Sequence, residues 1–259
     1  RYHVVARRAP AAAAALPPDE ARAWRQRGFA PRTFEQGTVF GIRGEVLDAR
    51  QLQLTVAPHD DEEAARTAAR TIAERYHIET SVHAELTSRP RATIQARDER
   101  GVVVRNDGVL WFAPVAARDT LRVDPPGRSY GGQIYVTADR NGALAVVNAV
   151  AEDRLLAGLI PAEMNPSAPL EALKAQAVAA RNQLLAKLGA RHLSDPFRLC
   201  AQTHCQVYAG AGQESPRASQ AAQATRGELL VAGAVGAEAL VDTVYSSSCG
   251  GHGEDNDQT

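Results

Sequence analysis

The sequence is poor in cysteine, in aromatic residues and in excess charge. Its 259 residues include 3 cysteines and 5 % aromatic residues, and Lys+Arg 29 against Asp+Glu 30 gives a formal net charge of -1. A near-neutral balance argues against a general nucleic-acid binder, which needs a basic face to neutralise phosphates. No apolar run approaches the roughly 20 residues that cross a bilayer. Hydrophobic residues at 44 % and charged residues at 23 % indicate a globular chain of one large or two modest domains.

Three cysteines are too few for a disulfide scaffold. Cys200 and Cys205 are close in sequence, and Cys249 is distant from both. An odd count with one close pair fits a metal site, or one disulfide with a free thiol. The chain begins at Arg1 instead of Met, so a signal peptide is neither indicated nor excluded.

The first 86 residues alternate between strand and helix patterns. Residues 60–76 are the clearest helix, because acids fill the first turn and alanines with Ile72 form a stripe at helical spacing. The expected elements are a strand at 1–8, a helix at 17–27, strands at 38–44 and 51–57, the helix at 60–76 and a strand at 81–86. This order resembles the sporulation-related repeat, a small α/β domain that in other proteins binds glycan strands stripped of their peptides. The alternative is a generic ferredoxin-like module of unknown role.

Residues 87–127 form a β-rich lead-in to a second domain, residues 87–259. Short β-prone segments are expected at 92–95, 101–105, 109–112, 133–137 and 143–147. Turn signals stand at 105–108 and 140–142. Helical periodicity then predicts a short helix at 152–160 and a long central helix at 170–188, capped by Ser167 and ended by Gly189. The predicted fold class is therefore α+β.

Five ordered sequence blocks stand between residues 128 and 259. They are Glu152-Asp153, Ile160-Pro161-Ala162-Glu163-Met164, EALKAQAVAAR at 171–181, HCQVYAG at 204–210 and VYSSSCGGHGE at 244–254. Together they resemble the stage II sporulation protein D family, also called the amidase-enhancer domain. Five blocks in the family's order are far more specific than a lone short motif.

The resemblance implies a lytic transglycosylase of denuded peptidoglycan with Glu163 as its catalytic residue. Ile160, Pro161, Ala162 and Met164 flank Glu163, and apolar neighbours favour a protonated carboxyl, which a general acid requires. This acid would protonate the glycosidic oxygen and then act as base on the sugar's own 6-hydroxyl. That route needs one carboxylate instead of the usual two. Spacing alone favours the alternative, an acid near a helix terminus stabilised by the helix dipole, and it is the family resemblance that favours catalysis.

The same resemblance predicts the other residues of the cleft. Tyr245 is the expected transition-state partner, and Gln206 is either structural or substrate-lining. Two residues of the long helix, Gln176 and Arg181, either line the cleft or form a buried hydrogen-bond network. The remaining predicted substrate-binding residues follow Tyr245 and are Ser246, Ser247, Ser248, Gly250 and Gly251.

His192, Cys200 and Cys205 are the candidate ligands of a structural zinc ion. Thiolate and imidazole suit zinc, and some family members hold it in this region. Cys249 or a water is the expected fourth ligand, because His204 is adjacent to Cys205 and is predicted to point away. A disulfide between Cys200 and Cys205 is the alternative.

The sequence departs from the family at Arg154, at Asn182-Gln183 and by stopping at Thr259, so part of the cleft is expected to be missing. A non-catalytic glycan-binding, amidase-enhancing protein is therefore the second hypothesis. A hydrolase using Cys249 or Ser248 with His252 is a weak third, because no orienting acid is fixed by sequence. The expected partners are denuded glycan strands and a cell-wall amidase, with no nucleic acid and no membrane span, in an extracytoplasmic location.

Overall fold

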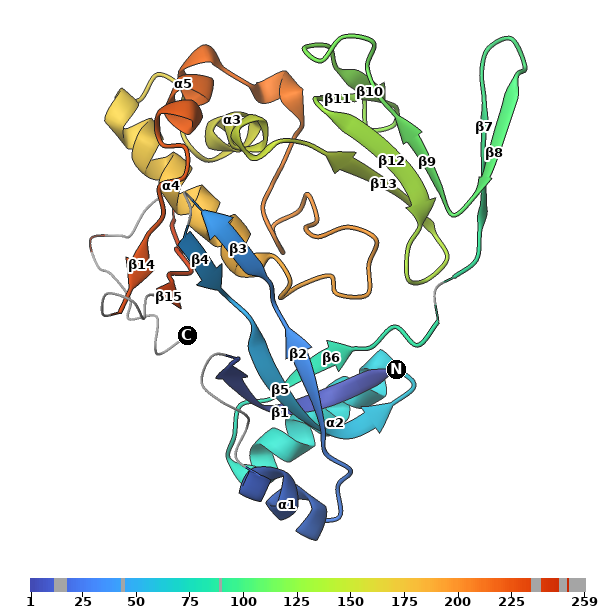
Figure 1. Ribbon diagram of the computed structural model, residues 1–259, viewed down its shortest axis with the longest axis vertical. Helices are drawn as coiled ribbons and strands as arrows, with labels where there is room; N and C mark the ends of the chain where they lie inside the picture. The colour runs from blue at the N-terminus through green and yellow to red at the C-terminus, as the bar shows by residue number, and fades with distance from the viewer. Residues whose placement is uncertain (12–17, 43–44, 89, 234–238, 247–250, 252–259) are drawn as a thin grey trace.

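The computed structural model is an α+β protein, as predicted, with the N-terminal sheet at one end and the other sheets and helices beyond it (Figure 1). The structure describes residues 1–11, 18–42, 45–88, 90–233, 239–246 and 251. No helix in these ranges combines the length and apolarity that a membrane span requires.

The N-terminal module, residues 1–86, is a four-stranded antiparallel sheet with two helices on one face. The sheet order is β2-β5-β1-β6. Its elements are β1 (Tyr2–Pro10), α1 (Pro18–Gln26), β2 (Arg32–Gln36), β5 (Gln51–His59), α2 (Glu62–Tyr76) and β6 (Ser81–Ala84). The predicted order of strands and helices is present, while the ferredoxin-like and sporulation-related-repeat assignments stay predictions.

Helix α2 forms where the acidic first turn and the alanine stripe predicted it. Asp61 caps it by accepting hydrogen bonds from the backbone N–H groups of Glu63 and Ala64, which satisfies two of the otherwise unpaired donors at the helix start. Ala69 and Ile72 are buried against the sheet and Trp24 of α1. This apolar layer is the core of the module.

The predicted strand at 38–44 is present as β3 (Val39–Ile42), but it pairs with β4 (Glu45–Asp48) in a separate hairpin. Strand β2, which was not predicted, takes its place in the four-stranded sheet. Gly37 separates β2 from β3 with a φ of 106°, and a Cβ there would lie 2.5 Å from the Ala49 carbonyl oxygen. Only glycine fits this sharp change of direction.

Residues 93–149 form three small antiparallel sheets. Their pairings are β7 with β8, β10 with β11, and the three-stranded order β13-β12-β9. The strands are β7 (Thr93–Arg97), β8 (Val103–Asp107), β9 (Val109–Phe112), β10 (Leu121–Val123), β11 (Arg128–Tyr130), β12 (Gln133–Ala138) and β13 (Leu144–Ala149). The turn at 140–142 joins β12 to β13 as predicted. The turn predicted at 105–108 makes no hairpin, because β8 pairs with β7 and the chain enters another sheet after Gly108.

The helical part of the second domain holds its main core. It comprises α3 (Glu152–Glu163), α4 (Leu170–Lys187), the short η1 (Ala211–Gln213), α5 (Pro216–Ala224) and the strand pair β14 (Val231–Ala232) and β15 (Ala239–Leu240). Leu173, Ala177 and Leu184 of α4 are buried against α3 and α5. The expected Ser167 cap is wrong, because its hydroxyl bonds the Asn165 side chain and Pro169 takes the cap position. Gly189 follows the helix with a φ of 73°, as predicted for a helix end.

The two parts of the chain are in direct contact. His3, Gln53 and Thr55 alternate with the core residues of their strands, so they lie on the sheet face opposite the helices, and each is 1 % exposed. Residues 189–194 cover this face. The Gly37 N–H donates to the Gly189 carbonyl at 2.8 Å, Gln36 donates to the Ala190 carbonyl, and Ser194 Oγ donates to the Ala84 carbonyl at 2.7 Å. The polar face of the N-terminal sheet is therefore an internal interface.

Candidate active site and candidate metal centre

Glu163 is the last residue of α3. Ile160 of the same helix is fully buried in the core, whereas Ala162 and Glu163 are exposed. The prediction that apolar neighbours would desolvate the carboxyl is therefore wrong, because Ile160 and Met164 pack into or against the core while Ala162 and Glu163 are exposed. The carboxylate is presented at the surface, where a large substrate can reach it.

Gln206 bridges the two residues predicted to be catalytic. Its side chain is 6 % exposed, and Nε2 donates to Glu163 Oε1 at 2.9 Å and to the Tyr245 hydroxyl at 2.7 Å. The structure thus brings Glu163, Gln206 and Tyr245 together from three distant segments. We call these three residues, with Gln176, the glutamate cluster.

The Tyr245 hydroxyl is held in its neutral form. Burial raises the pKa of Tyr245, and the nearby Glu163 carboxylate raises it further. A neutral phenol can donate a hydrogen bond to an oxygen on which negative charge develops. Tyr245 can therefore support an acid beside it without competing for its proton.

Gln176 completes the glutamate cluster from α4. It is 9 % exposed, and its side-chain amide lies close enough to the Tyr245 hydroxyl to lower the pKa of that group, which opposes the effect of burial. Gln176 Nε2 and Gln206 Oε1 are buried and have no hydrogen-bond partner among the described residues. Buried amides without partners are unusual. These two atoms are available to sugar hydroxyls or to a water beside the carboxylate.

An extended segment lying along α4 places Tyr245. The Asn182 side chain donates to the Val241 carbonyl at 2.9 Å, and Thr243 Oγ1 donates to the Ala179 carbonyl at 2.6 Å. Two residues further along the segment, Tyr245 meets Gln176. Val241, Thr243 and Tyr245 thus lie against Asn182, Ala179 and Gln176 in turn, about one helical turn apart and progressively closer to the start of α4.

The remaining predicted substrate-binding residues divide into two groups. Ser246 and Gly251 are exposed. Ser247, Ser248 and Gly250 lie outside the described residues, as do Cys249 and His252 of the hydrolase hypothesis.

Arg181 belongs to a buried hydrogen-bond network, which is one of the two alternatives that the sequence left open. It is 3 % exposed, and its Nε donates to Glu152 Oε1 at 2.6 Å. Its other nitrogens donate to the carbonyls of Glu228 and Ala222 at 3.2 and 3.4 Å. These contacts tie α3, α4 and α5 together, so the prediction that Arg181 binds substrate is not supported by its surroundings.

Sequence reasoning missed Asn182 as an organising residue. It is completely buried and bonds both the N–H and the carbonyl of Leu230 as well as the Val241 carbonyl. The sequence showed that Asn182 departs from the family pattern, but it did not indicate that this side chain would be buried and hydrogen-bonded. An amide at an apolar face of a long helix is the signal that could have indicated this role.

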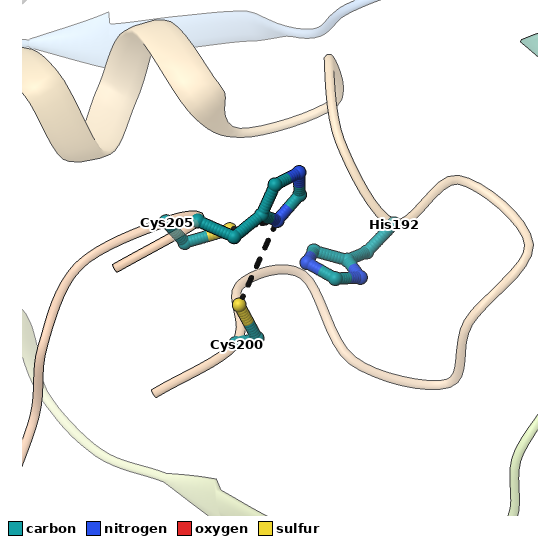
Figure 2. A group of neighbouring side chains, drawn as sticks. His192, Cys200 and Cys205 are labelled. Carbon is teal, nitrogen blue, oxygen red and sulfur yellow. Dashed lines mark hydrogen bonds between the residues drawn. The ribbon is translucent and has the colours of Figure 1, made fainter. Parts of the chain in front are cut away.

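The candidate metal centre contains four side chains. The ligand atoms of His192, Cys200, His204 and Cys205 all lie within 4.8 Å of one another. Figure 2 shows His192, Cys200 and Cys205 converging from the loop after α4. His204 Nδ1 lies 3.7 Å from Cys200 Sγ and 3.6 Å from Cys205 Sγ. Two thiols and two imidazoles are a common ligand set for structural zinc.

The prediction that His204 would point away from the metal site is wrong. Adjacent side chains point apart only in extended chain, and residues 201–205 turn, with the Cys205 N–H donating to the Gln202 carbonyl at 3.0 Å. The turn directs His204 and Cys205 toward one point. His204 therefore replaces Cys249 or water as the fourth candidate ligand.

The surroundings of the four residues fit a metal ion. His192 Nε2 is buried and has no hydrogen-bond partner among the described residues, while His192 Nδ1 lies 2.9 Å from Asp195 Oδ2. A carboxylate behind a histidine orients the ring toward a metal. Burial lowers the pKa of His204, which favours the neutral imidazole that binds metals. Cys200 and Cys205 are both free thiols, so the disulfide alternative is not adopted.

Comparison with known proteins shows that part of the chain is similar to a known family. Residues 140–231 match the family model SpoIID, described as Stage II sporulation protein. An uncharacterized protein of Brachyspira hyodysenteriae is 35 % identical over 123 residues, which are 48 % of this chain and 32 % of that protein. The chain thus spans about a third of that relative's length. No solved structure gives a significant match. The match supports the SpoIID family for the region that holds Glu163, Gln206 and the candidate metal ligands.

Proposed function

We propose that this protein is a peptidoglycan lytic transglycosylase that cleaves denuded glycan strands. The observation that carries the proposal is the hydrogen-bonded arrangement of Glu163, Gln206 and Tyr245, of which the first two lie in the SpoIID-matched segment. An exposed carboxylate beside a neutral phenol and two buried amides suits a polyhydroxylated polymer that is too large for a closed pocket. A strand of glycan is such a polymer.

One carboxyl group performs both proton transfers in this mechanism. Glu163 gives its proton to the glycosidic oxygen as the bond to the muramic acid C1 breaks. The resulting carboxylate takes the proton of the 6-hydroxyl of that same sugar while its oxygen bonds C1. The product is a 1,6-anhydro ring, no water is consumed, and Glu163 regains its proton. Among the described residues, Glu163 contacts an amide and lies beside a phenol, not a second carboxylate, which agrees with this route.

Gln206 and Tyr245 position the acid and stabilise charge in this scheme. Gln206 fixes one carboxylate oxygen, which leaves the other oxygen of Glu163 to face the sugar. The neutral Tyr245 hydroxyl can donate to a substrate oxygen on which negative charge develops, such as the leaving glycosidic oxygen. Preorganised donors of this kind typically contribute about 100-fold or more to a rate.

The four-residue cluster would hold a structural zinc ion. His192, Cys200, His204 and Cys205 would be its ligands, and the ion would stabilise the loop that leads into Gln206. A cell-wall substrate implies an extracytoplasmic location, and a cell-wall amidase that strips the peptides is the partner expected to precede this enzyme.

One observation favours a second candidate function. Glu163 is exposed instead of enclosed by its apolar neighbours, which also suits a glycan-binding, amidase-enhancing protein without turnover. Mass spectrometry of denuded strands after incubation with the protein separates the two. New ends lighter by one water than hydrolytic ends support the transglycosylase, whereas intact strands that co-sediment with the protein support the binding role.

A further inference from the structure

A polar cavity lies between the N-terminal sheet and the loop of the metal centre. Its volume is about 280 Å³, and its wall combines residues of β1, β5 and β6 with residues 190–195 and His204. A cavity of this size is near the lower end of the range for ligand sites, so it suits a group no larger than one sugar residue. Neither Glu163 nor Tyr245 lines it.

Besides the candidate metal ligand His192, two side chains in the cavity carry buried polar atoms without partners among the described residues. Gln53 is 1 % exposed, and its Oε1 has no hydrogen-bond partner among the described residues. His83 Nδ1 is in the same situation, and burial lowers the pKa of His83, so its ring is neutral. Buried polar atoms of this kind are normally satisfied by protein, water or ligand. The cavity therefore presents unsatisfied hydrogen-bonding atoms to a polar molecule.

The wall of the cavity is positively charged. Arg8, Arg66, Arg140 and Arg191 line it against two acids, Glu62 and Asp195. Glu62 pairs with Arg66 at 2.7 Å, and Arg140 is 3.8 Å from each acid. Both acids are therefore already engaged by arginines of the wall.

Two of these arginines have no carboxylate partner. Arg191 is half-buried, whereas Arg8 is exposed and donates to the Ser81 hydroxyl at 2.7 Å, and neither forms an ion pair with a residue that the structure describes. A partly buried guanidinium such as Arg191 is costly without a counter-charge, and guanidinium groups bind carboxylates in a bidentate geometry. The chemistry of the cavity therefore selects a small anion attached to a polar, sugar-like group.

We propose that this cavity binds the free lactyl carboxylate of peptide-free muramic acid. The inference rests on the proposed function, which supplies the glycan, but it concerns a separate site. Muramic acid that still carries its stem peptide has a neutral amide at this position and a bulky chain beyond it. The arginine-lined cavity would thus distinguish denuded strands from intact ones. His204 lines the cavity and lies two positions before Gln206, so one loop connects this site to the glutamate cluster.

The test measures binding without turnover. The full chain carrying Glu163→Gln is titrated with denuded strands, and with the same strands after carbodiimide coupling of methylamine to their carboxylates. Arg8→Gln and Arg191→Gln are then added separately, with Arg70→Gln as the matched control, because Arg70 is an exposed arginine of α2 outside the cavity. We expect a 5- to 20-fold loss of affinity on amidation and with each cavity variant, and no loss with Arg70→Gln.

Several outcomes would overturn the proposal. Equal affinity for amidated and untreated strands would do so, as would cavity variants that bind like the control. Peptide-bearing strands that bind as well as denuded ones, in an Arg8-dependent manner, would assign the cavity to the carboxylate of the stem peptide instead. If the Arg191→Gln protein loses zinc or unfolds, the affinity of the Arg8→Gln protein for the strands alone tests the proposal. The absence of anhydro products from the wild-type chain would refute the transglycosylase without affecting this binding comparison.

Discussion

Cys205 and Gln206 are chain neighbours that serve different centres. Cys205 Sγ lies 3.6 Å from His204 Nδ1 in the metal cluster, while Gln206 Nε2 lies 2.9 Å from Glu163 Oε1. A peptide unit has only two soft dihedral angles per residue, so fixing Cys205 restricts where Gln206 can point. The candidate metal centre is therefore a support for the glutamate cluster.

Replacing Gln206 should impair cleavage without unfolding the protein. Gln206→Ala removes the only described donor to Glu163 Oε1 and leaves Tyr245 without its amide partner. We expect kcat for denuded strands to fall about 100-fold with a smaller change in KM, because the lost contacts position the acid. Gln202→Ala, an exposed glutamine of the same loop, is the matched control. Equal kcat values for the two variants would show that Gln206 has no positioning role.

The metal centre predicts one zinc ion per chain. Elemental analysis of the purified protein should find it, and Cys205→Ala or His204→Ala should abolish it, whereas Thr203→Ala in the same turn should not. Losing a ligand that binds only the folded state should lower stability by about 4 kcal/mol, or roughly 10 °C in Tm. Full zinc retention in His204→Ala would remove His204 from the ligand set.

Arg181 is expected to behave as a structural residue. Arg181→Ala leaves two carbonyls and the half-exposed Glu152 carboxylate without their donor, and the loss of donors to such groups costs about 3 kcal/mol in total. Lys174→Ala on the same helix removes only an ion pair with the exposed Glu171 and should cost less than about 1 kcal/mol. Urea unfolding measures both. A stable Arg181→Ala protein with a raised KM would indicate that Arg181 binds substrate.

Much of the organisation was predictable from local patterns. The acidic first turn before the alanine stripe predicted α2, and the turn at 140–142 predicted the β12–β13 hairpin. Glu163 and Tyr245 were predicted from ordered motifs, and the structure brings both to Gln206. The helix and hairpin predictions were confirmed because each signal lies within a short stretch of chain, whereas the catalytic roles of Glu163 and Tyr245 stay predictions.

The failures depend on contacts between distant segments. The role of Arg181 could not be chosen, because surrounding alanines are compatible with both a cleft and a packed interface. The site of the second strand was missed because Gly37 ends β2 through a close approach to Ala49, which is distant in sequence. His204 was misjudged because its direction depends on a turn that the sequence does not signal. Exposure of Glu163 likewise depends on how α3 packs in the core.

Stability at alkaline pH should depend on Tyr208. Burial raises the pKa of Tyr208 to about 12, whereas the unfolded side chain titrates near pH 10. Since the folded pKa is higher, this contribution is complete below about pH 10 and is lost as the pH rises from about 10 to 12, by up to about 3 kcal/mol. Tyr208→Phe should remove that part of the decline, as measured by urea unfolding at several pH values. An unchanged slope in Tyr208→Phe would contradict the burial argument.

The central claim is that Glu163 is the acid and base of glycan cleavage. Its most direct test is mass spectrometry of denuded glycan strands incubated with the wild-type chain, Glu163→Gln and Glu171→Gln, the last being an exposed glutamate at the start of α4. We predict 1,6-anhydro-muramyl ends from the wild type and from Glu171→Gln, and none from Glu163→Gln, which should still bind the strands. Anhydro products from Glu163→Gln at the wild-type rate would contradict the account.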